Sequence, residues 1–284
     1  MPLNKLMNKI LPHEIFFTTF LCVICARLFI HTGASFSSIL FLLIIIISVA
    51  WVYVFRKSQI LRLGLYFILM NIIFNLLKNA STLINPSGKV DELLQYFDNV
   101  LIGGNMSLWL ESYMNKILTD VLAFCYMLFM VQLPMACFYY LFINRKYAKG
   151  FYSGLFSIYA LGFMGYIFFP AVGPYMAMED KFTVPVSGSF ITDFLHYMYP
   201  KGTNYTDVFP SLHCAVSCFI LFFDYQYHKL RFSLYLIPCV GLWFSTVYLR
   251  YHYFVDCLAG FILALVILIF TKFYMDRAED EENV

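Results

Sequence analysis

Residues 209–260 read FPSLHCAVSCFILFFDYQYHKLRFSLYLIPCVGLWFSTVYLRYHYFVDCLAG, and this stretch decides the fold of the chain. It contains two apolar runs, 209–226 and 231–250, each about long enough to cross a bilayer, with a short polar turn between them. The pattern predicts a transmembrane hairpin, and the two open ends of a hairpin lie on the same face of the membrane. His213 stands at the first open end and His252 at the last. We therefore expect the two imidazole rings to lie close together.

The composition of the chain is that of a membrane protein. Hydrophobic residues make up 61% of it and charged residues 13%, and the mean hydropathy is +0.73. Because lipid offers no hydrogen bonds to exposed backbone groups, the spanning elements are expected to be helices. We predict an all-α integral membrane protein, a polytopic bundle of about eight transmembrane helices. The expected spans are 14–33, 36–55, 62–79, 117–142, 152–173, 209–226, 231–250 and 255–274.

Charge and cysteine usage argue against other classes of protein. The formal net charge is only +2, which does not favour a nucleic-acid partner. The eight cysteines all fall inside apolar runs, which is typical of small buried residues rather than of a disulfide framework. The sequence carries no signal for an oligomeric state.

Basic residues in the short connections indicate the orientation in the membrane. With the N-terminus inside, the inner connections hold Arg56, Lys57, Arg62, Arg145, Lys146, Lys149, Lys229 and Arg231. The outer connections are poor in basic residues for their length. We therefore expect both termini, with the acidic tail 276–284, to be cytoplasmic. The open end of the hairpin would then be extracytoplasmic, on a periplasmic or lumenal face.

Polar features outside the hairpin lead to further expectations. The outer connection 80–116 is polar, and 91–101 is expected to form a short helix on the outer surface. Asn71 and Asn75 have helical i, i+4 spacing, which predicts hydrogen bonds to a neighbouring helix. Asp120 stands inside a later span, where it is either functional or faces water or a nearby lysine.

The first open end of the hairpin has the features of a phosphate site. Pro210 suits the first helical turn, where its missing N–H is not needed. The amides of Ser211, Leu212 and His213 would then point outward from a helix N-terminus, an arrangement that binds anions. The Ser211 hydroxyl adds a donor, and Arg250 can bind two phosphate oxygens at once.

The second open end supplies a nucleophile. His252 and Asp256 are four residues apart, so that on a helical turn the carboxylate holds one ring nitrogen and fixes the tautomer of the other. This ring can attack phosphorus while His213 protonates the leaving oxygen as a general acid. The structural alternatives are that Asp256 caps the last span and that Ser211 only starts a helix. These loops contain no acidic cluster, so we expect metal-independent chemistry with no cofactor.

These residues resemble the type 2 phosphatidic acid phosphatase (PAP2) superfamily of integral membrane enzymes. Residues 210–213, PSLH, resemble its P-S-x-H motif, and Ser245, His252 and Asp256 match its S-x6-H-x3-D spacing. The resemblance covers about 115–275 and implies a six-helix catalytic core in that part of the chain.

The resemblance also implies roles and domains. His252 would form a phosphohistidine, Asp256 would orient it, His213 would act first as acid and later as base, and Ser211 would bind phosphate. The expected organisation follows from these assignments. It consists of N-terminal transmembrane helices and an outer loop at 1–114, a catalytic transmembrane domain at 115–275, and a cytoplasmic tail at 276–284.

The departures from the PAP2 pattern indicate which branch of the superfamily the chain resembles. Thr246 stands where the family usually has arginine, and Arg250 is the expected substitute. PAVGP at 170–174 replaces the first family motif, and Tyr175 stands where related sequences often carry a basic residue, so we include it among the phosphate-binding candidates. FPSLH and the pattern S-T-x-Y-L-x-x-H-Y-F-V-D at 245–256 resemble the inositol phosphorylceramide synthase branch.

That branch transfers a phospho-headgroup between lipids, which implies phospholipid or sphingolipid-type substrates and a lipid phosphotransferase activity. The first alternative is a lipid phosphatase that hydrolyses a phosphomonoester or a pyrophosphate lipid. A lipid transporter and a non-catalytic lipid-binding relative are further alternatives. A transporter would carry ionisable residues at mid-membrane and a pseudo-repeat between its halves, and the sequence has neither.

Overall fold

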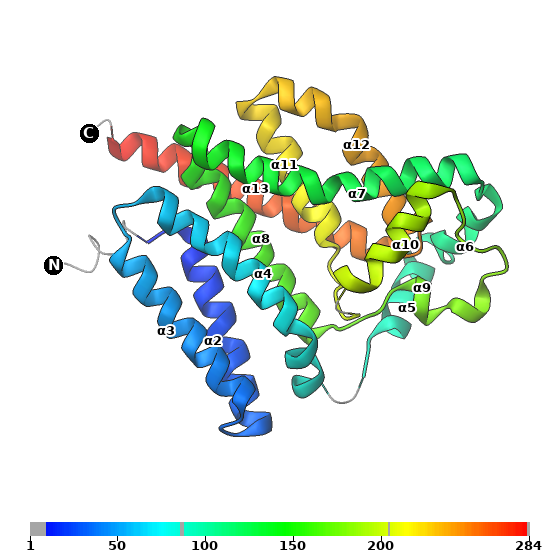
Figure 1. Cartoon of the computed structure of the whole chain (residues 1–284), viewed down its shortest axis with the longest axis horizontal. Coiled ribbons are helices and arrows are strands. Elements are labelled where there is room, and N and C mark those ends of the chain that lie inside the picture. The colour runs from blue at the N-terminus through cyan, green and yellow to red at the C-terminus, as the bar shows by residue number, and fades with distance from the viewer. Residues whose placement is uncertain (1–9, 86–87, 204, 283–284) are drawn as a thin grey trace.

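The computed structural model describes residues 10–85, 88–203 and 205–282, and within these ranges the chain is helical (Figure 1). The only pairing of β type among the described residues is an isolated parallel bridge between Ala171 and Asp207. The long helices are α2 (Pro12–Thr32), α3 (Phe36–Val54), α4 (Gln59–Ile84), α7 (Lys116–Phe138), α8 (Ala148–Phe168), α11 (Leu212–Tyr227), α12 (Lys229–Tyr248) and α13 (Phe254–Glu282). The short helices are α5 (Asp91–Ile102), α6 (Met106–Leu110), α9 (Pro174–Ala177) and α10 (Phe190–Gly202).

Seven of these helices are long and apolar enough to cross a membrane, which confirms a multi-pass membrane protein. The eighth expected span is α11, whose 16 residues make it shorter than a typical spanning helix. It begins at Leu212, with Ser211 as its N-cap, so Pro210 precedes the cap and does not occupy the first helical turn as expected. Together with α7, α8, α12 and α13, it accounts for five helices of the expected catalytic core, and α4 packs along α8 beside them.

Helix α11 lies at the centre of the bundle, in contact with α7, α8, α12 and α13, whereas α2 and α3 lie to one side (Figure 1). The start of α2 and the end of α13 are found at one end of the molecule, and α5, α6, α9 and α10 gather at the other. That both ends of the chain share one side of the membrane stays a prediction, as does which side that is.

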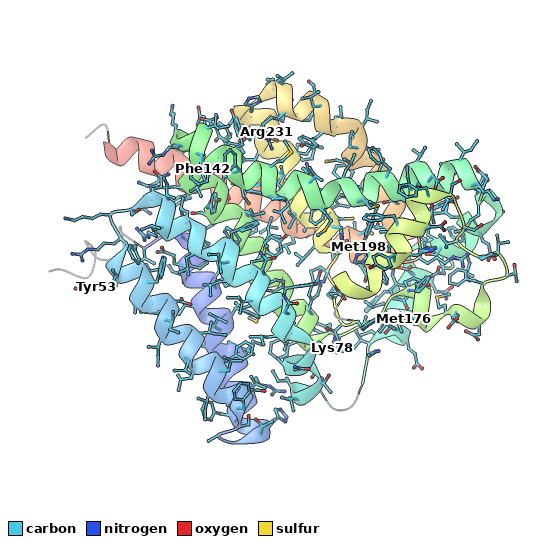
Figure 2. All side chains as sticks on the ribbon, in the orientation of Figure 1. Tyr53, Lys78, Phe142, Met176, Met198 and Arg231 are labelled. Atoms are coloured by element: carbon cyan, nitrogen blue, oxygen red, sulfur yellow. The ribbon has the colours of Figure 1, made fainter. Side chains whose placement is uncertain are left out.

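The predicted hairpin is closed at its turn by a buried ion pair. Arg231 at the start of α12 places Nε 3.1 Å from both carboxylate oxygens of Asp224 near the end of α11. The Tyr140 hydroxyl donates to the same carboxylate at 2.6 Å. Arg231 and Phe142 are seen at the end of the bundle away from Met176 (Figure 2). Because the turn is fixed at that end, the starts of α11 and α13 meet at the other.

Small residues on α8 allow the start of α11 to approach closely. Most of α8 is buried, and a Cβ atom added to Gly162 would collide with Leu212. A Cβ at Gly165 would collide with Pro210 and with the backbone of Phe209. Close packing at small residues is a common way for membrane helices to associate. The glycines therefore determine how deeply the segment that leads to His213 is held in the bundle.

The connection 80–116 contains the short helix that the sequence predicts, as α5, and α5 contacts α13. The expectation for Asn71 and Asn75 was wrong, because each amide donates to the carbonyl four residues earlier in α4. Exposed amides satisfy themselves on their own helix when no polar partner lies opposite. Asp120 contacts the start of α10. Its carboxylate accepts from the backbone N–H of Ser189 and from the hydroxyl of Thr192, and so caps α10.

Candidate active site

The two predicted histidines meet. Nε2 of His252 lies 3.4 Å from Nδ1 of His213, and the ring centroids are 5.6 Å apart. His213 comes from the first turn of α11, and His252 comes from the turn between α12 and α13. His252 is almost fully buried, at 2% exposure. The hairpin topology therefore brings together two imidazoles that are 39 residues apart in sequence.

Asp256 lies behind His252. Its Oδ2 is 3.6 Å from Nδ1 of His252, and the carboxylate is fully buried. The same Oδ2 accepts the backbone N–H of Tyr253 at 2.9 Å, so the carboxylate also caps the start of α13. The carboxylate therefore caps α13 and also lies beside Nδ1 of His252, at a distance longer than a hydrogen bond, so its role in orienting the ring stays a prediction. Since Nδ1 faces the carboxylate, Nε2 is the nitrogen left to face a substrate.

The backbone of α12 holds the turn that carries His252. The carbonyl oxygen of Thr246 accepts the N–H groups of both Tyr251 and His252 at 3.0 Å. Arg250, in the same turn, has φ 67°, a left-handed conformation that is unusual for a residue with a side chain. Such a conformation persists only where the surrounding structure determines it. The position of the His252 ring is therefore set by a tight, tied turn.

Two acids of α5 support this turn from outside the hairpin. The Asp98 carboxylate accepts the N–H groups of Phe254 and Val255, the first residues of α13, at 3.1 and 2.8 Å. The Asp91 carboxylate accepts the N–H groups of Val172 and Gly173 and the hydroxyl of Tyr253. Sequence reasoning assigned neither acid. The available signal was their spacing of seven residues, which places both on one face of a helix.

A cavity of about 360 Å³ opens beside the two histidines, between α7 and α10. The tyrosines Tyr126 and Tyr251 line it, together with Thr203 and Asp207. Its remaining wall is mostly apolar and includes Met127, Met130 and Val131 on α7 and Phe194, Leu195 and Met198 on α10 (Met198 is labelled in Figure 2). Met130 is 70% exposed, so this apolar wall continues onto the outer surface of the bundle. The cavity can therefore hold a group that is polar at one end and apolar at the other.

The family model described as PAP2 superfamily matches residues 93–270, which is more than half of the chain. The chain belongs to the PAP2 superfamily. It is also similar to the catalytic subunit of inositol phosphorylceramide synthase from Saccharomyces cerevisiae, with 46% identity over 66 residues, and these cover 23% of this chain and 16% of that protein. The inositol phosphorylceramide synthase of Candida albicans is 35% identical over 81 residues, or 27% of this chain and 17% of that protein. No solved structure matches the chain significantly.

In this PAP2 protein the serine of the P-S-x-H motif is placed as a helix cap. The Ser211 hydroxyl accepts the N–H of Cys214 at 3.3 Å, and the side chain is fully buried. The Ser211 amide donates to the carbonyl of Asp256 at 3.0 Å, which joins the starts of α11 and α13. The side chain of Leu212 packs toward Gly162. Neither Ser211 nor Leu212 lines the cavity, so their role as phosphate ligands stays a prediction.

The structure places Arg250 away from the cavity wall. One guanidinium nitrogen donates to the carbonyl of Val184 at 2.5 Å, and the guanidinium carbon lies 3.7 Å from the centroid of the Phe182 ring. Val184 is held in turn by the carboxylate of Glu111, which accepts its N–H. Arg250 therefore connects the segment between α9 and α10, which contains Val184, to the turn that carries His252. Its phosphate-binding role in place of the arginine missing at Thr246 stays a prediction.

The stacked rings of Tyr199 and Tyr251 lie between Tyr175 and the cavity with the histidines. The N–H of Tyr175 donates to the carbonyl of Arg250 at 2.7 Å, and its ring lies 6.0 Å from those of Tyr199 and Tyr251. Tyr199 and Tyr251 are stacked, 4.1 Å apart, and they line both the cavity and a second hollow of about 220 Å³ that Tyr175 faces. Tyr175 is thus in the outer hollow rather than beside the histidines.

Burial determines the protonation state of His252. It lowers the pKa of His252 from 6.5 to about 4, although the negative charge of Asp207 and a backbone hydrogen bond at Val208 act in the opposite direction. His252 is therefore neutral at physiological pH. The described residues contain no cluster of three or more histidine, cysteine or acidic side chains that could hold a metal ion. Metal independence itself stays a prediction.

Proposed function

We propose that this protein is a membrane lipid phosphotransferase that works through a phosphohistidine on His252. The observation that carries the proposal is the approach of His252 Nε2 to His213 Nδ1, at 3.4 Å, with Asp256 behind the first ring. This is the order of nucleophile, acid and orienting carboxylate that phosphoryl transfer through histidine needs. Membership of the PAP2 superfamily and similarity to inositol phosphorylceramide synthases support it.

In the first half-reaction the lone pair of His252 Nε2 attacks the phosphorus of a donor lipid. The N–P bond forms as the bond from phosphorus to the leaving oxygen breaks. His213, which takes up a proton as the anionic phosphate binds beside it, gives that proton to the leaving oxygen. Asp256 stabilises the His252 ring as its positive charge develops. The product alcohol leaves, and the phospho-headgroup stays on the enzyme.

In the second half-reaction a hydroxyl group attacks the phosphohistidine. Neutral His213 takes the proton of that hydroxyl, the new O–P bond forms, and the N–P bond breaks to restore His252. Transfer and hydrolysis differ only in whether the hydroxyl belongs to a lipid or to water. The apolar wall on α7 and α10 favours a lipid acceptor, because it offers a place for hydrocarbon chains and few partners for ordered water. A sphingolipid-type acceptor, as the names of the relatives suggest, fits this preference.

We also propose that the reaction takes place at the extracytoplasmic leaflet, with both termini in the cytoplasm. The support is the excess of Lys and Arg in the connections on the side of the termini, such as Arg56, Lys57 and Arg145. The cavity lies near the short helices at the other end of the bundle, among them α10.

The test is a transfer assay with a donor lipid labelled in its phosphate, with and without a lipid that carries a free hydroxyl. The wild-type protein is expected to move label to the acceptor lipid and to carry acid-labile label itself. His252→Ala is expected to lower transfer by at least about a thousandfold and to abolish labelling of the protein. His31→Ala, at an exposed histidine of α2, is the matched control and should transfer normally.

Undiminished transfer by His252→Ala would remove this residue from the mechanism. Release of all the label into water, even when acceptor lipid is present, would instead establish the phosphatase alternative.

A further inference from the structure

Asp207 is a carboxylate on the wall of the catalytic cavity, and the mechanism does not use it. It lines the cavity together with His213 and His252, and its charge acts on the His252 ring. Its backbone is fixed by the bridge to Ala171. The hydroxyl of Thr203 donates to Oδ1 at 2.7 Å, which orients the carboxylate. A defined negative charge thus faces the place where a phosphate group would sit.

This charge is unexpected in a site for phosphate. The described residues that line the cavity include no lysine or arginine, and Asp207 is their only carboxylate. A phosphomonoester above its second pKa of roughly 6 carries nearly two negative charges, whereas a phosphodiester carries one. The extra charge would be repelled by the carboxylate of Asp207, which is partly buried in the cavity wall and so less screened than a fully exposed charge. Binding of the two lipid classes should therefore differ.

We propose that Asp207 is a specificity-determining residue that rejects phosphomonoester lipids and leaves the cavity to phosphodiester lipids. The inference rests on the proposed function, because it assumes that a lipid phosphate occupies this cavity. It adds a reason why the site would act as a transferase on diesters rather than as a phosphatase on monoesters. The selection comes from repulsion of the wrong substrate, a common source of specificity.

The experiment measures binding rather than turnover, so that it does not depend on which reaction the protein performs. The His252→Ala protein, which lacks the nucleophile, is titrated with two short-chain lipids at about pH 8, where a monoester is almost fully doubly charged. One lipid is dihexanoyl phosphatidate, a monoester, and the other is dihexanoyl phosphatidylglycerol, a diester. The quantity of interest is the ratio of their dissociation constants, monoester over diester.

In the His252→Ala parent this ratio is expected to be well above one. Asp207→Asn, which keeps the shape of the side chain, should lower the ratio by at least about tenfold, equivalent to ~1.4 kcal/mol. Thr203→Val removes the hydrogen bond but leaves the charge, and it should keep most of the selectivity, as should Asp207→Glu. If Asp207→Asn fails to fold, Asp207→Glu still tests whether the selectivity follows the charge.

A ratio that Asp207→Asn leaves unchanged would overturn the proposal, as would an equal loss of selectivity in Thr203→Val, which would point to loop structure instead of charge. If Asp207→Asn does not fold, loss of selectivity in Asp207→Glu, where the charge is kept, would also overturn it. Failure of the proposed function gives a different pattern. The wild-type protein would then show no transfer in the lipid assay, whatever the binding ratios are. Binding of neither lipid to the parent would overturn both ideas.

Discussion

At the scale of single residues, the proposed reaction depends on a histidine that stays neutral while buried. Burial keeps the pKa of His252 at about 4 in the folded protein, below the usual 6.5. A ring with an unshifted pKa would be mostly protonated at pH 5.5, whereas this ring is mostly neutral there. The nucleophile should therefore remain available well into the acid range.

The pH dependence of turnover tests this protonation state. We predict that the acid limb of kcat/KM falls near pH 4 rather than near 6.5. The substrate must be a phosphodiester lipid, because a monoester titrates near pH 6 and would mask the enzyme group. An acid limb at 6.5 would mean that the folded site does not depress the pKa of His252.

How far sequence alone reaches differs between residues of this site. His213, His252 and Asp256 could be predicted, because hairpin topology and i, i+4 spacing are local properties of the chain. The direction in which the Arg250 side chain points could not be predicted. It depends on a left-handed φ and on a hydrogen bond to the carbonyl of Val184, 66 residues away. Asp207 was missed because it stands in an irregular loop, where no periodicity indicates which side chains turn inward.

At the scale of elements, a helix outside the hairpin determines how α13 begins. The first amides of a helix have no partner within it, and here α5 supplies one through Asp98. Hydropathy predicted the long helices, and the polar segment 91–101 predicted α5. The contact between α5 and α13 joins residues more than 150 positions apart, so no pattern within either segment could indicate it.

Removal of the Asp98 carboxylate should disturb catalysis through the position of His252. Asp98→Ala leaves two amides unpaired, which costs about 1–3 kcal/mol for each if they stay buried. We expect a lower melting temperature and a fall in kcat of about tenfold or more, because small displacements of a catalytic group are costly. Purified protein in detergent serves for both measurements.

Glu92→Gln is the matched control for this prediction, because Glu92 is an exposed acid on the same helix. It should change neither quantity. Full activity in Asp98→Ala would show that the turn keeps its shape without α5.

At the scale of the whole molecule, the two ends of the bundle carry different structural features. One end carries the ion pair of Asp224 and Arg231 that closes the hairpin, and the other carries the histidines with the short helices around them. Hydropathy predicted that the chain spans the membrane several times, and the apolar run 209–226 predicted α11, although its 16 residues make it shorter than the seven candidate spans.

The orientation of the bundle can be tested with cysteines placed at its two ends. Glu92→Cys lies on α5, at the end with the catalytic cavity, and Lys57→Cys lies between α3 and α4. Both positions are exposed, and neither contacts the site. In sealed vesicles with the extracytoplasmic face outward, a membrane-impermeant maleimide should label Glu92→Cys at once and Lys57→Cys only after permeabilisation. The parent protein, whose eight cysteines lie in apolar runs, gives the background. Labelling in the reverse order would place the histidine pair at the cytoplasmic leaflet, since the positive-inside bias is the sole physical basis for the present assignment.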